Sequence, residues 1–306
     1  MKSALLKAFG GAEVIAVGEV NLRNLQPNEA VVSVEVAGAN PLDLKIIAGY
    51  MQQVIPVEFP YVPGTDFSGV VDTVGADVTH LSPGDRVFGR TAPDAGGAFG
   101  RSLVIAATDL CVIPSEMSFE QAAALPTAFG TARQALFDAG NLRQGQRVLI
   151  HAGAGGVGSM AIQQAHHAGA HVVATASARN VELVKSLGAD EVIDYRTEDF
   201  TRVRNIDLVL DTIGGETLEK SWSVLGAGGR IASLVEVGIK PMHGQMGEFV
   251  FFASATPFLS EAIRQFQAGH LQVITDSIFS LDDVRSALEK LATGHACGKV
   301  LVRLSN

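Results

Sequence analysis

The sequence contains very little cysteine. Only Cys111 and Cys297 occur among its 306 residues. Two isolated thiols exclude a disulfide framework and a four-cysteine metal site, and they are typical of proteins from a reducing compartment. We therefore expect a cytoplasmic protein.

Long apolar runs and clusters of positive charge are also missing. No stretch approaches the roughly 18 apolar residues that a membrane-spanning helix needs. Lys7 interrupts the first apolar stretch, so we expect no signal peptide. The net charge is −9, and no basic cluster offsets it, which argues against a nucleic-acid partner. We expect neither nucleic acid nor a membrane among the partners.

The chain has ample material for a buried core. Hydrophobic residues make up 47% of the sequence and charged residues 18%. Such a composition is typical of a globular protein with a large core. The length fits about two domains.

A glycine-rich turn, HAGAGGVG at residues 151–158, is the central motif of the sequence. Gly153, Gly155 and Gly158 have the G-x-G-x-x-G spacing of a dinucleotide-binding turn. There the glycines permit a tight turn, close approach of the backbone to pyrophosphate, and close packing of helix on strand. The helix that follows presents backbone N–H groups and the positive end of its dipole to the phosphates. The predicted pyrophosphate-binding residues are Gly153, Ala154, Gly155, Gly156, Val157 and Gly158.

The context of the turn strengthens this interpretation. An apolar run at 148–150 precedes it, and apolar residues recur at helical spacing from Ala161 to Ala168 until Gly169 ends the helix. A second apolar run follows at 171–175, which completes a strand–helix–strand unit. Further strands are expected at 191–194, 207–211 and 230–234, with helices between them, so the pattern predicts a doubly wound parallel sheet.

Further helices, strands and one loop are expected between residues 180 and 303. Asn180 is expected to cap a helix over 181–187 that Gly188 ends. Residues 244–247 are expected to form a loop and 259–269 a helix. Strands at 272–279 and 299–303 flank a helix at 281–293.

The first 120 residues differ from the rest. They contain short strand patterns at 30–36, 69–74, 86–88 and 102–106, separated by dense turn signals. The alternation of strands and helices begins after this region, where helices are expected at 118–124 and 127–137. We place a domain boundary near residue 120.

The end of the second strand of the parallel sheet predicts which nucleotide binds. A site for NAD usually has an acidic residue there that binds the ribose 2′-hydroxyl. This chain has none, and Ser177 and Arg179 could instead bind a 2′-phosphate. Tyr195 and Arg196, after the third strand, are second partners. Alternatively, Arg179 is a solvated residue at a helix start. The missing acid and the arginine together favour NADP.

Motifs along nearly the whole chain resemble one family. They are GANPLD at 38–43, PGTDFSGVV at 63–71, LPTA at 125–128, the glycine turn, LGAD at 187–190, VLDTIGG at 209–215 and GKV at 298–300. The sequence resembles the medium-chain dehydrogenase/reductase superfamily, in its zinc-free quinone oxidoreductase branch, which is zeta-crystallin-like. The resemblance implies an α/β protein. A GroES-like β-rich catalytic domain (1–121 and 272–306) adjoins a Rossmann domain with a doubly wound parallel sheet (122–271), and the substrate lies in the cleft between them.

The chain departs from the zinc-dependent branch of that superfamily at each catalytic ligand. Asn40 stands where that branch has a cysteine, Thr65 where it has a histidine, and Thr127 where its third ligand falls. None of these side chains is a thiolate, imidazole or carboxylate. The eight histidines are scattered, so we interpret them as structural or surface residues. We expect no metal.

Without a Lewis acid, reduction of a simple ketone loses its usual stabilisation of the alkoxide. A quinone or an α,β-unsaturated carbonyl delocalises the charge onto oxygen, where hydrogen-bond donors suffice. We therefore expect an NADPH-dependent reductase of such acceptors. Two alternatives stay open: a 2-alkenal or enoyl-thioester reductase, and an NADPH-binding sensor protein with little turnover.

The resemblance also implies the residues around the nicotinamide. Asn40, Pro41 and Asp43 would line its site, and Thr131 would contact the cofactor. Ser233, Leu234, Phe251 and Phe252 would border the ring. Tyr50 is a phenol near the expected cleft, a candidate donor of a proton or hydrogen bond, or else a packing residue. Asp43 could equally be the structural partner of a basic residue.

A homodimer is the last expectation from the resemblance. It would form by edge-to-edge pairing of the Rossmann sheets through the region after Leu234. Residues 235–239 and 249–252 are apolar, and exposed patches of that kind mark interfaces. The alternative is that they fold inward over the nicotinamide site.

Overall fold

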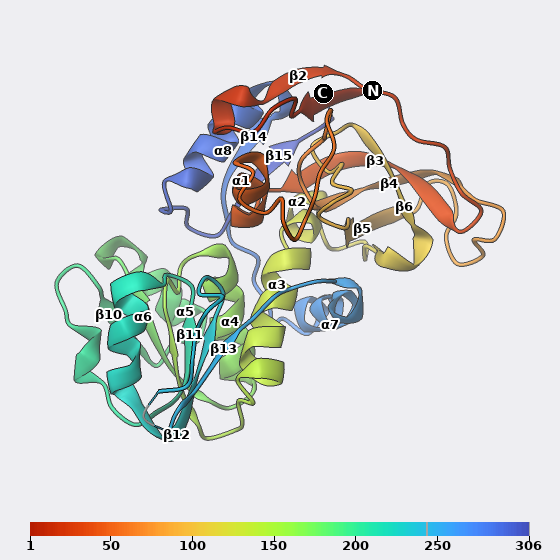
Figure 1. Cartoon of the computed structure of the whole chain (residues 1–306). Coiled ribbons are helices and arrows are strands. Elements are labelled where there is room, and N and C mark those ends of the chain that lie inside the picture. The colour runs from red at the N-terminus through yellow and green to blue at the C-terminus, as the bar shows by residue number, and fades with distance from the viewer. Residues whose placement is uncertain (243, 306) are drawn as a thin grey trace. The chain divides into compact units, whose positions relative to one another are not determined.

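The computed structural model of the chain describes residues 1–242 and 244–305 (Figure 1). The chain forms two compact units. The strand-rich unit comprises Met1–Thr127, Ala253–Ile263 and Val273–Asn306, and the parallel-sheet unit comprises Ala128–Phe252 and Arg264–Gln272. His243 and Asn306, which fall within the two predicted domains, lie outside the described residues.

The strand-rich unit is built on one mixed sheet. Its strands follow the order β14-β15-β3-β4-β5-β7, and β6 pairs with β3. Their bounds are β3 (Glu29–Gly38), β4 (Asp66–Val74), β5 (Arg86–Arg90), β6 (Ser102–Ala106), β7 (Leu110–Val112), β14 (Thr275–Ser280) and β15 (Lys299–Arg303). A separate hairpin pairs β1 (Lys2–Leu5) with β2 (Ala16–Glu19). The four short strands expected before residue 107 are all present.

Three helices accompany this sheet: α1 (Pro41–Ile47), α2 (Phe119–Ala123) and α8 (Val284–Ala292). Ser118 caps α2 by accepting a hydrogen bond from the backbone of Gln121, as the capping-box sequence predicts. The apolar face of α8 buries Val284, Ala287 and Leu288 in the same core as Val32, Phe67 and Val302 of the sheet. Residues from both ends of the sequence therefore form one hydrophobic core.

The parallel-sheet unit has six strands in the order β10-β9-β8-β11-β12-β13. They are β8 (Arg147–Ile150), β9 (His171–Ala176), β10 (Glu191–Asp194), β11 (Ile206–Asp211), β12 (Leu225–Ser233) and β13 (Met246–Phe249). Every neighbouring pair is parallel. The chain starts in the middle at β8, builds one half, and returns to build the other from β11. Ligands of such sheets bind at the carboxyl ends of the strands, beside that switch point.

The helices of this half are α3 (Pro126–Arg133), α4 (Gly156–His167), α5 (Val181–Ser186) and α6 (Gly215–Ser221), and α7 (Thr256–Gln267) is divided between the two units. A π-helical stretch, Gln134–Ala139, continues α3. Gly169 and Gly188, at φ +75° and +107°, end α4 and α5 in the left-handed conformation that glycine favours. The α/β fold predicted from the sequence, a β-rich unit and a doubly wound parallel sheet, is confirmed.

Two local predictions were wrong. Residues 244–247 were expected to form a loop, but Met246 and Gly247 belong to β13, which pairs with β12 from Arg230↔Met246 onward. Asn180 does not cap α5 with its side chain. It ends a 3₁₀ turn at φ −107° and ψ 1°, not in the extended conformation from which a capping side chain reaches back to the helix.

Candidate active site

The glycine-rich turn connects β8 to α4 as predicted. A Cβ atom at Gly158 would lie 2.2 Å from the carbonyl oxygen of Ala152, so this glycine lets the helix pack against the turn. Gly153 is tight against Ala174 and Ile162 at 3.0 Å. A Cβ at Gly155, the N-cap of α4, would meet only the Ala152 oxygen, at 3.2 Å. Gly155 is therefore the least crowded of these three glycines, and the turn fits a pyrophosphate group.

A buried histidine holds the turn in shape. The Nε2 atom of His151 lies 3.0 Å from Ser221 Oγ, and Nδ1 lies 3.2 Å from Thr175 Oγ1. Ser221 donates its own hydrogen to the carbonyl of Thr217, so its oxygen accepts from His151 Nε2–H. Thr175 Oγ1 in turn accepts from the backbone N–H of Ala152, which has φ +51°. Burial lowers the pKa of His151 to about 4, so the imidazole is neutral and this network is fixed.

The predicted ribose-phosphate residues gather at one corner of the parallel sheet. Ser177 and Arg179 follow directly after β9, with Ser177 buried and Arg179 exposed. The backbone N–H of Tyr195, after β10, donates to the carbonyl of Ala176 at 3.2 Å. The ends of β9 and β10 are thus adjacent. Ser177 and Arg179 therefore follow one strand end, and Tyr195 follows the neighbouring one.

Ser233 lies at the carboxyl end of β12, where it was expected, but its hydroxyl is engaged within the protein. It donates to Asp211 Oδ2 at 2.7 Å and accepts from the backbone N–H of Glu236 at 3.0 Å. Asp211 also accepts from the N–H groups of Ile213 and Gly214. Sequence reasoning quoted this Asp211 motif only for its resemblance. In the structure Asp211, the last residue of β11, accepts from the Ser233 hydroxyl at the end of β12, and its backbone carbonyl accepts from the N–H of Leu234.

Phe251 and Phe252 pack beside α3, the helix that carries Thr131. A Cβ at Gly130 would lie 2.2 Å from Cζ of Phe252, so the ring lies directly on this glycine. Gln134 donates its side-chain amide to the carbonyl of Phe251 at 3.3 Å. Phe252 is 8% exposed and Phe251 48% exposed. The structure therefore brings three of the predicted nicotinamide residues onto two adjacent segments of the parallel-sheet unit.

The strand-rich unit contains a buried polar cluster, which we define as Asn40, Asp43, Asp66, Arg90, Thr127 and Lys299. Asp66 is at its centre, with no exposed surface. It accepts from Thr127 Oγ1 at 2.6 Å and from the side-chain amide of Asn40 at 3.0 Å. Lys299 Nζ lies 3.5 Å from Asp66 and donates to Asn40 Oδ1 and to the carbonyl of Ala39. Two cations, Lys299 and Arg90, thus act on the two buried carboxyls, Asp66 and Asp43.

Two residues of this cluster, Asn40 and Thr127, stand where the resemblance implies metal ligands in the zinc-dependent branch. The amide of Asn40 and the hydroxyl of Thr127 are both engaged in hydrogen bonds, and a buried ammonium lies beside them. The hydroxyl of Thr65 is buried and has no hydrogen-bond partner among the described residues. In the part of the chain that the structure describes, no three histidine, cysteine, aspartate or glutamate side chains are placed to hold a metal ion.

Asp43 caps α1 from the third helical position. Its Oδ2 atom accepts from the backbone N–H of Asn40 at 2.7 Å, while Oδ1 has no hydrogen-bond partner among the described residues. Burial raises the pKa of this carboxyl to about 7, and the charge of Asp66 adds to the effect. Lys299 and Arg90 act in the opposite direction. Asp43 is therefore a buried helix-capping residue.

Tyr50 and Pro41 lie at the surface of the strand-rich unit. Tyr50 is 82% exposed, so the interpretation of Tyr50 as a packing residue was wrong. Its phenol is available as a donor. Asn40 and Asp43, by contrast, are 4% and 1% exposed.

Sequence reasoning missed three members of the cluster as site residues: Asp66, Arg90 and Lys299. Asp66 and Lys299 lay inside motifs quoted for the resemblance, and both are the first residues of strands. The available signal was a charged residue at the first position of a strand, since burial of such a residue demands a partner.

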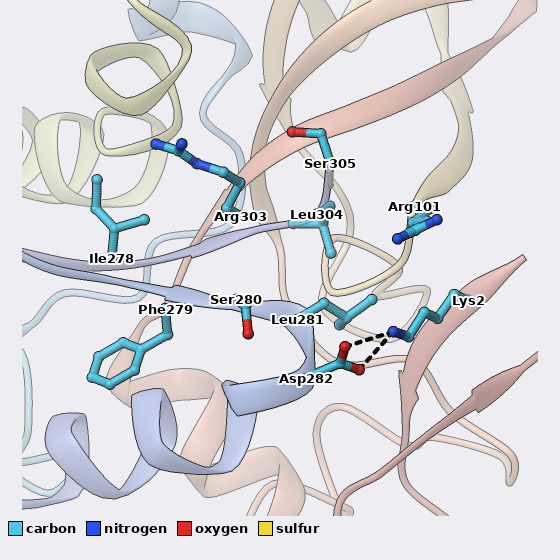
Figure 2. Close-up of a pocket in the computed structure, with 10 residues that line it drawn as sticks. All are labelled: Lys2, Arg101, Ile278, Phe279, Ser280, Leu281, Asp282, Arg303, Leu304 and Ser305. Carbon is cyan, nitrogen blue, oxygen red and sulfur yellow. Dashed lines mark hydrogen bonds and ion pairs between the residues drawn. The ribbon is translucent and has the colours of Figure 1, made fainter.

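A cavity of about 450 Å³ also lies in the strand-rich unit (Figure 2). It is lined by the ends of β14 and β15, by Lys2 and by Arg101. Lys2 pairs with Asp282 at 2.6 Å and Arg303 with Glu120 at 2.7 Å. None of the predicted site residues lines this cavity.

None of the helices among the described residues is long and apolar enough to cross a membrane.

Comparison with protein-family models identifies both halves of the chain. The model described as alcohol dehydrogenase GroES-like domain matches residues 26–126, and the model described as zinc-binding dehydrogenase matches residues 187–302. Among curated proteins, the mitochondrial NAD(P)H oxidoreductase RTN4IP1 of Danio rerio is 33% identical over 91% of this chain and 84% of its own length.

Solved structures match the whole chain. The quinone oxidoreductase from Coxiella burnetii has a TM-score of 0.92 and 31% identity, covering 100% of this chain and 99% of that one. The Escherichia coli quinone oxidoreductase complexed with NADPH has a TM-score of 0.88 and 25% identity, covering 99% and 100%.

Proposed function

The chain belongs to the medium-chain dehydrogenase/reductase superfamily, in its quinone oxidoreductase-like branch, and from this premise we propose a zinc-independent, NADPH-dependent reductase. It transfers hydride to a quinone or another conjugated carbonyl acceptor. The observation that carries the proposal is the buried polar cluster. Asn40, Thr65 and Thr127 replace metal ligands, and Asn40 and Thr127 are hydrogen-bonded around Asp66 with Lys299 beside them.

The cluster favours conjugated acceptors because it offers no Lewis acid. In a quinone or an enone the negative charge spreads to an oxygen atom, where a hydrogen-bond donor stabilises it. We propose the exposed phenol of Tyr50 as that donor. Asn40 and Asp43 are buried, and we assign them positioning roles: Asn40 links Asp66 to Lys299, and Asp43 caps the helix that leads to Tyr50.

The parallel-sheet unit supports NADPH as the cofactor. When bound, the dihydronicotinamide supplies the hydride. The N–H groups at the start of α4 bind the pyrophosphate at Gly155, and Ser177, Arg179 and Tyr195 form the corner for the 2′-phosphate. In this proposal the segments that border the nicotinamide carry Thr131, Ser233, Leu234, Phe251 and Phe252.

Steady-state assays test the proposed activity. The purified chain is given NADPH with, separately, a quinone, a 2-alkenal and an enoyl thioester. We expect turnover of the quinone. Faster turnover of the enal or the thioester would identify an alkenal or enoyl-thioester reductase instead. Rates no higher than the background for every acceptor, with tight NADPH binding, would favour the sensor protein.

Zinc-independence is tested on the same preparation. Elemental analysis of protein purified without added metal should find well under one zinc per chain, and a chelator should leave the rate unchanged. The physical reason is the ammonium of Lys299, which would repel a second cation next to Asp66. Stoichiometric zinc with chelator-sensitive activity would contradict the proposal.

We further propose a cytoplasmic homodimer. Both cysteines are free thiols, in keeping with a reducing compartment. One edge strand of the parallel sheet is β13, and Val237, in the segment between β12 and β13, is 75% exposed. Pairing of two β13 strands across a two-fold axis would leave neither β13 edge open.

Light scattering should give about twice the chain mass of 32.0 kDa. Val237→Asp should dissociate the dimer and lower its activity at the same time. A fully active monomer at micromolar concentration would contradict the dimer.

A further inference from the structure

One guanidinium group holds two distant points of the chain. Arg90 is the last residue of β5 and is 6% exposed. Its Nε atom donates to Thr127 Oγ1 at 3.0 Å, and its Nη1 atom donates to the carbonyl of Ala253 at 2.7 Å. The chain crosses between the two units four times. Thr127 is the last residue before the first crossing, and Ala253 is the first residue after the second. Arg90 therefore ties the first two crossings to β5.

The surroundings of Arg90 explain why an arginine serves there. Asp66 lies directly opposite in the antiparallel pairing of β4 with β5. Burial lowers the pKa of Arg90, while the charges of Asp66 and Asp43 raise it. The Thr127 hydroxyl donates to Asp66 and so accepts from Arg90. A planar guanidinium can donate in two directions at once, whereas the ammonium of a lysine is a point charge on a flexible stem.

The two crossings lead directly to the segments predicted to border the nicotinamide. Thr127 is in the first turn of α3, one turn before Thr131, and Ala253 follows Phe252 without a gap. Within the parallel-sheet unit these segments already pack together, with the ring of Phe252 on Gly130 and the amide of Gln134 on Phe251. A displacement of either Thr127 or Ala253 would therefore displace both of the segments that are predicted to border the nicotinamide.

We infer that Arg90 is a positioning residue that sets the nicotinamide end of the cofactor site by fixing the first two chain crossings. This inference rests on the proposed NADPH-dependent function. The pyrophosphate and the ribose phosphate are bound elsewhere, at the glycine turn and beside Arg179. Loss of Arg90 should therefore affect hydride transfer far more than cofactor affinity.

The test compares Arg90→Lys with Arg86→Lys. Arg86 is on the same strand and also donates to a backbone carbonyl, that of Met117 at 2.7 Å, and lies over the ring of Phe119. It touches neither crossing. The full-length proteins are compared by NADPH titration, kcat, the primary deuterium isotope effect with 4-deuterated NADPH, and hydrogen exchange of the free protein.

For Arg90→Lys we expect kcat to fall roughly tenfold or more, because misplacement of reacting groups by about 1 Å can cost ~100-fold. The isotope effect should rise, and the dissociation constant of NADPH should change by less than about threefold, equivalent to ~0.7 kcal/mol. Hydrogen exchange should quicken at residues 126–134 and 250–254. Arg86→Lys should change none of these, even where it lowers the melting temperature.

The other outcomes are equally informative. An Arg90→Lys protein with unchanged kcat and unchanged exchange in both segments would overturn the inference. If the wild-type chain neither binds nor oxidises NADPH, the proposed function itself fails, while the exchange measurement still tests the tie. Should Arg90→Lys fail to fold, Thr127→Val removes one acceptor of Arg90, and Thr127→Ser restores it. The valine variant should show the same kcat loss and the serine variant should recover it, and equal kcat values would again overturn the inference.

Discussion

His151 Nε2 donates to Ser221 Oγ across 3.0 Å, and this bond fixes the imidazole in one tautomer. The other nitrogen must then accept, and it does so from the hydroxyl of Thr175. A second proton on the ring, at Nδ1, would point toward the hydrogen of the Thr175 hydroxyl, so that two donors would face each other. The loop that shapes the nucleotide site therefore depends on a histidine that stays neutral.

This dependence predicts a loss of stability in mild acid. The folded-state pKa of His151 is about 4 and the unfolded value is 6.5, so its contribution is complete above pH 6.5 and is lost as the pH falls toward 4. Relative to His151→Asn, the wild type should lose roughly 2 kcal/mol between pH 7.5 and 5. Urea unfolding followed by the single tryptophan, Trp222, reports on the same unit. A difference between the two proteins that is equal at both pH values would contradict this.

Asp43 predicts the opposite pH dependence. Its folded-state pKa of about 7 lies above the unfolded 3.8, so folding becomes less favourable as the pH rises from 3.8 to 7. Asp43→Asn keeps an acceptor for the Asn40 N–H and cannot ionise. The variant should gain roughly 2–3 kcal/mol over the wild type between pH 5 and 8.

Scanning calorimetry at pH 5, 6, 7 and 8 measures this gain. Asp72→Asn is the control, because Asp72 is exposed on β4 and accepts from Ser33. A gain of the same size in that control would mean that burial of Asp43 is not the cause. Since the effects of His151 and Asp43 have opposite signs between pH 4 and 6.5, they partly cancel in the wild type, and each is measured against its own variant.

The alternating strands and helices of the parallel-sheet unit could be predicted from the sequence. Apolar runs and helical spacing located β8, α4, β9 and the strands after them, because each burial pattern is set by neighbours along the chain. β13 escaped prediction because Gly244 and Gly247 resemble a loop. Its strand conformation comes from hydrogen bonding to β12, a partner more than ten residues away.

Some residues of the candidate site were likewise predictable from the sequence, and others were not. The glycine turn has a local motif, and the structure places each of its glycines as the motif requires. Arg90 lies in no such motif, and the GKV motif around Lys299 does not indicate that the lysine is buried. Their burial depends on Asp66 and Asn40, which are brought to them by strand pairing, so only the folded sheet reveals them.

The glycines of the turn allow a matched comparison. Gly158→Ala places a Cβ 2.2 Å from a backbone oxygen, so it should cost roughly 2 kcal/mol or more of stability. Gly155→Ala meets only one atom, at 3.2 Å, and should leave the melting temperature nearly unchanged. It should still raise the dissociation constant of NADPH by roughly tenfold, about 1.4 kcal/mol, because its methyl group occupies the space for pyrophosphate. Calorimetry and NADPH titration of both variants check this. Full NADPH affinity in Gly155→Ala would mean that pyrophosphate does not bind at the turn.

The last prediction concerns the choice between NADPH and NADH. Arg179 follows β9 in the place where an acid would select NADH, so it should pair with the 2′-phosphate of NADPH and have no counterpart on NADH. Arg179→Ala should weaken NADPH binding by roughly 1.5–3 kcal/mol, the value of a charged hydrogen bond, and leave NADH binding unchanged. Calorimetric titration with each cofactor measures both affinities. Arg202→Ala is the control, because that exposed arginine of the same unit pairs with Glu191 and Glu198 instead, and its loss should affect neither cofactor. Equal affinity of the wild type for NADPH and NADH would show that the corner formed by Ser177, Arg179 and Tyr195 does not read the phosphate.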